Sequence, residues 1–222
     1  HHADHCELVE DLYEALCRSR AALDEIAARS PAPIVACGDN VDGFLVNPRL
    51  FERYLMPVYE RQAQVLHAQG KLMAVHMDGR LAVLKELIAR TPIDIVEALH
   101  PPPMGDLSLR EALDAWPDKA IWVGFPGSIY ALGPQETRRY AIELLEEILP
   151  GERVVIEMST ENLVSNKNLV ALMDVLQNAR LPIPDQQVQE SRHQRRPVVC
   201  DHLIQNLYLF VIGQLRVAQG DD

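Results

Sequence analysis

The stretch Lys71–Gly79, KLMAVHMDG, decides how the rest of the chain is interpreted. It is a short apolar run that reaches His76, continues to Asp78 and stops at a glycine. A run of this length between turn residues predicts a buried strand. His76 and Asp78 then stand where the strand opens into its loop, the usual place for chemistry in α/β proteins.

The same order of strand and helix recurs on both sides of this stretch. Helical periodicity over about residues 4–28 comes before a predicted strand at Pro33–Cys37, and later strands are predicted at 93–98, 120–123 and 153–156. Such alternation is typical of a parallel sheet with helices outside, either a (β/α)8 barrel or a doubly wound sheet. We expect an α/β chain of the TIM-barrel type with about five βα units, too few to close eight strands, so that the barrel is incomplete at its N-terminus.

Between the first two strands, Asn47-Pro48 predicts the start of a long helix that runs through Leu66. Pro57 lies inside this pattern and should kink the helix or split it in two, because proline removes one backbone donor. Further along, residues 1–182 are predicted to form the barrel portion and residues 183–197 a polar linker. Residues 198–222 form a C-terminal amphipathic segment in this interpretation.

Composition narrows the class of partner. The formal net charge of −11 disfavours nucleic acid and anionic membranes, and no apolar run reaches the roughly 18 residues of a membrane span. The four cysteines are widely spaced, without a C-x-x-C pair, which argues against a disulfide framework and a cysteine-based zinc knuckle. A reducing, cytoplasmic setting and a small-molecule substrate are therefore expected.

Polar residues follow each predicted strand and are the candidates for a site. They are Asp39, Asn40, His76, Asp78, Glu97, Ser128 and Glu157. The H-x-D spacing places His76 and Asp78 on the same side of an extended segment, so one divalent metal could accept both. Glu157 is the expected third ligand, and acid–base chemistry is the alternative use of the same groups. A histidine near a strand end can equally be a hydrogen-bonded structural residue.

Taken in order, several motifs resemble the uroporphyrinogen decarboxylase superfamily. They are GDN at Gly38–Asn40, NPRLF at Asn47–Phe51, HMDG at His76–Gly79, IDIVEALHPPPMGD, KAIWVGFPGS, PQETRRYAIELLEE and NKNLVALMDVL. The resemblance covers about residues 4–182 and implies the C-terminal portion of a (β/α)8 barrel. Each motif is modest alone, and their order carries the resemblance.

The resemblance implies two branches of activity. Corrinoid-dependent methyltransferases hold zinc through H-x-C on this strand and a later cysteine, and the zinc activates a thiol. Here His76 matches the histidine, Asp78 replaces the first cysteine and Met158 falls near the second. A zinc or other divalent site of His76, Asp78 and Glu157 would therefore offer nitrogen and oxygen ligands, which are harder than the thiolates of the methyltransferases. In this reading His76, Asp78, Glu97 and Asp39 are catalytic, and Asn40, Ser128 and Glu157 bind substrate.

The resemblance favours methyl transfer to a corrinoid or thiol acceptor, with a corrinoid protein and a homodimer as the implied partners. Cofactor-free decarboxylation of uroporphyrinogen or a smaller acid is the alternative. It is disfavoured because the predicted rim is acidic and would repel a polycarboxylate. A barrel fragment that acts as an interaction module, without catalysis, is the third possibility.

Overall fold

The computed structural model describes residues 5–148, 153–158 and 164–179. Two compact units divide the chain, His1–Ala120 and Ile121–Asp222, and each is described by itself. The predicted linker 183–197 and the amphipathic segment 198–222 lie outside the described residues. No helix among the described residues is long and apolar enough to cross a membrane.

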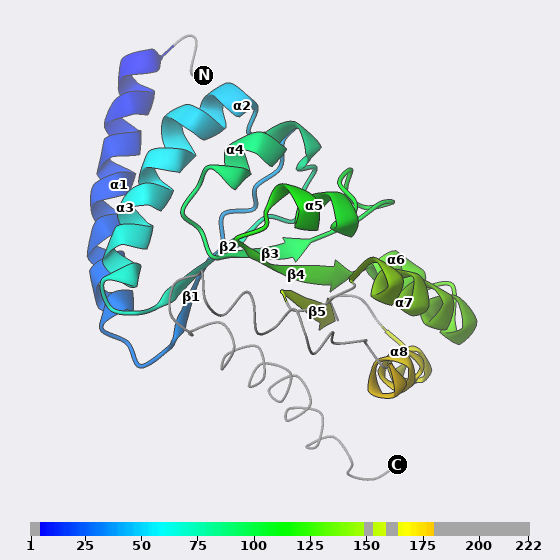
Figure 1. Cartoon of the computed structure of the whole chain (residues 1–222). Coiled ribbons are helices and arrows are strands. Elements are labelled where there is room, and N and C mark those ends of the chain that lie inside the picture. Colours follow the sequence, from blue (N-terminus) through cyan, green and yellow to red (C-terminus); the bar gives the residue numbers. More distant parts are fainter. Residues whose placement is uncertain (1–4, 149–152, 159–163, 180–222) are drawn as a thin grey trace. The chain divides into compact units, whose positions relative to one another are not determined.

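The first unit contains three parallel strands that alternate with helices. Strand β2 pairs with β1 on one side and with β3 on the other. In Figure 1 the long helix α1 runs beside α3. The elements of this unit are α1 (Cys6–Ala28), β1 (Ile34–Cys37), α2 (Pro48–Leu50), the π-helix η1 (Phe51–Leu55), α3 (Met56–His67), β2 (Leu72–His76), the 3-10 helix η2 (Ala82–Leu84), α4 (Lys85–Ala89), β3 (Ile95–Leu99) and α5 (Leu109–Ala115).

The second unit continues the alternation with two paired strands. Strands β4 and β5 are parallel, and Gly124 is opposite Glu157 in their register. Helices α7 and α8 pack against each other in this unit. Its elements are β4 (Ala120–Phe125), which begins at the boundary between the units, α6 (Gly127–Tyr130), α7 (Pro134–Ile148), β5 (Val154–Met158) and α8 (Asn166–Asn178).

These elements confirm the predicted mixed α/β class. All five predicted strands are present, and a helix follows each of them. The pairs β1–β2, β2–β3 and β4–β5 are parallel. Closure into a barrel of the TIM type stays a prediction. The sequence interpretation missed α6, because the glycines and proline of GFPGS are typical of a loop.

The long helix predicted from Pro48 to Leu66 is split, as expected from Pro57. Asn47 caps the first piece by accepting the backbone N–H of Leu50, and Pro48 occupies its first turn. The chain then forms the π-helical stretch η1, and α3 starts at Met56 with Pro57 in its first turn. A proline is tolerated there because the first N–H groups of a helix have no intrahelical partner.

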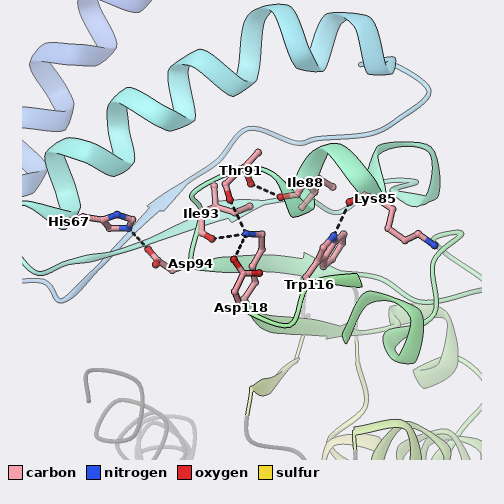
Figure 2. Close-up of polar contacts among 9 residues, drawn as sticks. His67, Lys85, Ile88, Thr91, Ile93, Asp94, Trp116 and Asp118 are labelled. Carbon is pink, nitrogen blue, oxygen red and sulfur yellow. Dashed lines mark hydrogen bonds and ion pairs between the residues drawn. The ribbon is translucent and has the colours of Figure 1, made fainter. Parts of the chain in front are cut away.

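Buried polar contacts of Lys119 and Trp116 stabilise the first unit away from the loops that follow β1 and β2. The Lys119 ammonium is fully buried and donates to the carbonyl oxygens of Thr91 and Ile93 at 2.9 and 3.3 Å. Close by, the indole N–H of Trp116 donates to the carbonyl oxygen of Lys85 at 3.0 Å (Figure 2). These contacts join α4, α5 and the loop before β3, so they support the fold at the strands' N-terminal ends.

Candidate functional site

His76 and Glu97 form the centre of the candidate site because strand register places them side by side. His76 is the last residue of β2 and is opposite Glu97 of β3. Their side chains lie on the same side of the sheet, and His76 Nδ1 is 2.5 Å from Glu97 Oε2. The sequence predicted both residues as candidates, and the structure brings them into direct contact.

Asp78 joins them from the loop that follows β2. Its Oδ2 lies 3.5 Å from His76 Nε2, on the other side of the imidazole from Glu97. The exposed fractions of the three side chains are 29% for His76, 43% for Asp78 and 14% for Glu97. Glu97 is thus the inner member of the cluster, and Nε2 of His76 and the Asp78 carboxylate form its outer side.

In its neutral form, the ring of His76 is expected to adopt one tautomer. An ionised carboxylate only accepts hydrogen bonds, so the bond to Glu97 places the proton on Nδ1 in the neutral imidazole. Nε2, beside Asp78, is then the lone-pair nitrogen. The structure therefore favours Nε2 as the nitrogen that binds a ligand or moves a proton.

The carboxylates also change the acidity of His76. Partial burial alone would lower its pKa, but the hydrogen bond and charge of Glu97, aided by Asp78, outweigh burial and raise the pKa above the ordinary 6.5. The protonated form of His76 consequently persists to higher pH than in an isolated side chain.

Backbone strain lies directly beside the cluster. Ala98, within β3, has φ of 63°, in the left-handed region that residues with a Cβ rarely adopt. This conformation interrupts the regular alternation of β3 immediately after Glu97, and Glu97 still accepts the Met77 N–H at 2.9 Å through its carbonyl oxygen. Such strain is often found at functional sites, where the surrounding structure maintains it.

Asp39 and Asn40 lie in the loop after β1, next to this cluster. Val41, the next residue, donates its N–H to the His76 carbonyl oxygen at 3.3 Å. Asn40 adopts φ of 45°, which asparagine tolerates better than most residues. The loop is therefore tied to the end of β2, although Asp39 itself has another partner.

That partner is Arg20 of α1, which the sequence interpretation did not single out. Arg20 donates two hydrogen bonds to Asp39, at 2.8 and 3.3 Å, and a third to Gln62 at 3.3 Å. Burial alone would lower the pKa of Arg20, but the hydrogen bond and charge of Asp39 raise it, so the guanidinium stays charged. Nothing in the sequence spacing pairs a helix residue with a strand end this far away.

A second residue absent from the predictions, Asp42, holds the loops together. Its carboxylate accepts the N–H of Phe44 at 2.7 Å and of Arg80 at 2.9 Å. These bonds, first that from Arg80, lower the pKa of Asp42. A Cβ at Gly79 would stand 2.3 Å from an Asp42 carboxylate oxygen, which explains the glycine of HMDG. The dipeptide Asp42-Gly43 is a turn signal that could have revealed this role.

The two remaining candidates belong to the second unit. Ser128 lies in the short helix α6, and Glu157 lies in β5 opposite Gly124. The structure thus brings together His76, Asp78 and Glu97. The participation of Ser128 and Glu157 stays a prediction from the sequence.

His76 and Asp78 are residue types that bind the divalent metal implied by the resemblance. A separation of 3.5 Å between His76 Nε2 and Asp78 Oδ2 matches two ligands that each lie about 2.0–2.2 Å from one tetrahedral ion. The contact of Nδ1 with Glu97 is the outer-shell carboxylate that metal-binding histidines usually have. Among the described residues, no group of three or more His, Cys, Asp and Glu side chains is placed to hold a metal ion. Within the described residues, the cluster therefore brings together two side chains of the kind that bind metals, His76 and Asp78, and metal binding stays a prediction.

Known proteins add no family to this picture. A scan against protein-family models and a search of curated proteins both found no match to this chain.

Proposed function

We propose that this chain carries the reaction centre of a metal-assisted methyltransferase of the uroporphyrinogen decarboxylase type, which passes a methyl group to a corrinoid or thiol acceptor. The observation that carries the proposal is the His76 imidazole between two carboxylates, with Nδ1 on Glu97 and Nε2 beside Asp78. This arrangement combines an outer-shell carboxylate with an adjacent nitrogen and oxygen ligand.

Each residue has a distinct task in this proposal. His76 Nε2 and an Asp78 oxygen bind a divalent metal. Glu97 fixes the orientation and tautomer of His76 and makes Nε2 a stronger donor. Arg20 holds Asp39 in place at the neighbouring strand end, where it can orient substrate. When bound, the metal supplies Lewis-acid activation of the acceptor.

Metal binding can be tested with Zn²⁺ by titration calorimetry and with Co²⁺ by absorption spectroscopy. His1, His2 and His5 should first be replaced by alanine, because this histidine-rich segment could bind metal independently. We expect one ion per chain, strong loss of binding in His76→Ala, and roughly 10- to 100-fold weaker binding in Glu97→Gln.

His67 provides the matched control for this titration. It is also a partly exposed histidine beside a carboxylate, 2.7 Å from Asp94 (Figure 2), but it lies at the opposite end of the strands. His67→Ala should leave the affinity unchanged. Absence of metal binding in the parent protein, or equal losses in His67→Ala and His76→Ala, would contradict the proposed ligands.

Methyl transfer itself can be followed with methylcobalamin and a small thiol. The thiolate sulfur forms the new S–C bond, the Co–C bond breaks, and cobalt keeps the electron pair as Co(I). We expect the zinc-loaded protein to accelerate the spectral change and His76→Ala to abolish the acceleration. Metal binding without faster methyl transfer would support the proposed metal ligands and refute the proposed transfer of methyl to a thiol.

The second candidate is decarboxylation without a cofactor, and the raised pKa of His76 favours it. A protonated imidazole could deliver a proton to the carbanion that remains when CO₂ leaves a carboxylate substrate. Release of CO₂ from a small acid in the presence of a chelator would support this candidate. Loss of activity on chelation would exclude it.

A further inference from the structure

The long helix α1 buries little of its own surface against the rest of its unit. Of its 23 residues, two are buried in the part of the chain that the structure describes, Asp24 and Ala28. The neighbouring helix α3 (Figure 1) has 12 residues and buries five of them. Because burial of apolar surface is the main stabilising term in folding, α1 is weakly held for its length.

The first half of α1 is held by partly exposed polar contacts. Tyr13 donates to the carbonyl oxygen of Tyr54 at 2.9 Å, and Glu10 accepts a hydrogen bond from Arg53 at 2.6 Å. The Arg53 and Glu10 side chains are 49% and 32% exposed, so water competes for this pair. Contacts of this kind contribute little stability, and they permit local opening of a helix.

The second half of α1 is held by a chain of hydrogen bonds that reaches the candidate site. Gln62 of α3 donates to Asp24 of α1 at 2.8 Å and accepts from Arg20 of α1 at 3.3 Å. Arg20 also donates to both carboxylate oxygens of Asp39, in the loop after β1. The contacts that dock α1 on α3 are therefore continuous with the contact that holds Asp39.

Asp24 weakens this chain of hydrogen bonds. Its side chain is buried, and its Oδ2 accepts no hydrogen bond among the described residues. Burial raises the pKa of Asp24, and the charge of Asp39 adds to the rise. The charges of Arg20 and Arg61 and the bond from Gln62 act in the opposite direction. An ionised carboxylate that lacks part of its hydrogen bonds is costly to bury, so its charge opposes docking of α1.

We propose that α1 is a detachable helix that regulates the candidate site: while docked it holds Asp39 through Arg20, and its release frees the Asp39 carboxylate. Asp39 orients substrate in the proposed function, so this regulation rests on that function, and release of α1 should lower methyl transfer. The loop that carries Asp39 is also bonded to the end of β2, because Val41 donates its N–H to the His76 carbonyl oxygen at 3.3 Å.

Hydrogen exchange of the full chain, followed amide by amide with NMR, tests detachment. The amides of α1 should exchange through a local opening, and those of α3 and β2 only through global unfolding. Arg20→Gln removes the charged bonds to Asp39 and should speed exchange of α1 roughly 5- to 30-fold. The Val41 amide should exchange faster in the same variant. Asp24→Asn removes the buried charge and should slow exchange of α1.

The matched control is Arg139→Gln in α7 of the second unit. Arg139 also donates to two carboxylates, Glu136 at 2.8 Å and Glu143 at 2.5 Å. This variant should leave exchange of α1 and of Val41 unchanged. Equal protection of α1 and α3 in the parent chain, or equal effects of the two arginine variants, would overturn detachment. Opening of α1 without any response of Val41 would overturn its link to the site.

Methyl transfer from methylcobalamin to a thiol separates this regulation from the proposed function. As urea is added to the zinc-loaded chain, the rate should fall together with release of α1, before α3 unfolds. Glu10→Gln/Tyr13→Phe loosens α1 without touching Asp39 and should shift both transitions to lower urea together. A rate that falls only when α3 unfolds would overturn the regulation and leave the proposed function intact. A parent chain without methyl transfer would refute the proposed function and the regulation, whereas local exchange of α1 would still support detachment.

Discussion

The imidazole of His76 lies between two carboxylates, and each ring nitrogen is near one of them. Glu97 contacts Nδ1 of the ring, and Nε2 lies beside Asp78. The strained backbone at Ala98 follows the residue that performs this task. At the residue scale, the candidate site is therefore a histidine whose tautomer and orientation are fixed from the inner side.

Replacing Glu97 by glutamine should lower the pKa of His76 relative to the wild-type protein. The amide keeps a similar shape but removes the negative charge that stabilises the imidazolium. A proton NMR titration of the histidine C–H resonances measures the change. Asp94→Asn, next to His67, is the control and should leave His76 unaffected. An unchanged titration of His76 in Glu97→Gln would refute the assigned cause.

The left-handed conformation of Ala98 predicts an unusual tolerance of glycine. Relief of about 1–2 kcal/mol of backbone strain should offset the lost methyl group and the added freedom of the unfolded chain. We expect the free energy of unfolding of Ala98→Gly, measured by urea denaturation, to lie within about 0.5 kcal/mol of the wild-type value. Ala74→Gly removes an equally buried methyl group in β2 and should cost about 1–2 kcal/mol. Similar losses in the two variants would argue against strain at Ala98.

At the scale of single elements, the helices begin where local chemistry supplies caps. Asn47 and Ser165 accept backbone N–H groups at the starts of α2 and α8. Ser108 and Glu111 form a reciprocal capping box at the start of α5. Such caps satisfy N–H groups that have no intrahelical partner, so they define where each helix can start.

The capping box of α5 can be tested by Ser108→Ala. This change removes the acceptor of the Glu111 N–H and should lower the free energy of unfolding by about 1 kcal/mol. Ser108→Asp retains an acceptor at the same position and should lose much less. Chemical denaturation of both variants provides the measurement, and equal losses would show that the cap contributes little.

Much of this element order could be predicted from the sequence. KLMAVHMDG and the other short apolar runs predicted all five strands, and Pro57 predicted the split between α2 and α3, because both signals depend on residues close in sequence. The helix α6 was missed because its turn residues resemble a loop.

Part of the candidate site could also be predicted. H-x-D placed His76 beside Asp78, and the position of Glu97 at the next strand end made it a candidate. The strand register that puts Glu97 on Nδ1, the reach of Arg20 to Asp39 and the strain at Ala98 depend on tertiary packing. No local pattern encodes these contacts, so the sequence alone did not reveal them.

At the scale of the molecule, the candidate site and the buried polar contacts lie in different parts of the first unit. The loops after β1 and β2 and the end of β3 carry the candidate site of the first unit. The buried contacts of Lys119 and Trp116 at the opposite strand ends support the fold (Figure 2).

Stability should depend on pH through His76. Its pKa is raised in the folded chain, so its contribution is fully present below the unfolded pKa of about 6.5 and is lost as the pH rises through the folded pKa. In the presence of a chelator, the stability difference between wild type and His76→Gln should therefore shrink as the pH rises through this window. Urea denaturation at several pH values measures it, and a difference that grows with pH would contradict the sign of the shift.

The most direct test of the central claim is the ¹⁵N NMR spectrum of the His76 ring with and without Zn²⁺. At a pH above the raised pKa of His76, we expect a neutral ring with its proton on Nδ1, and a zinc-dependent shift at Nε2 that Asp78→Asn weakens. A proton on Nε2 in the neutral ring, together with no response of either nitrogen to zinc, would contradict it.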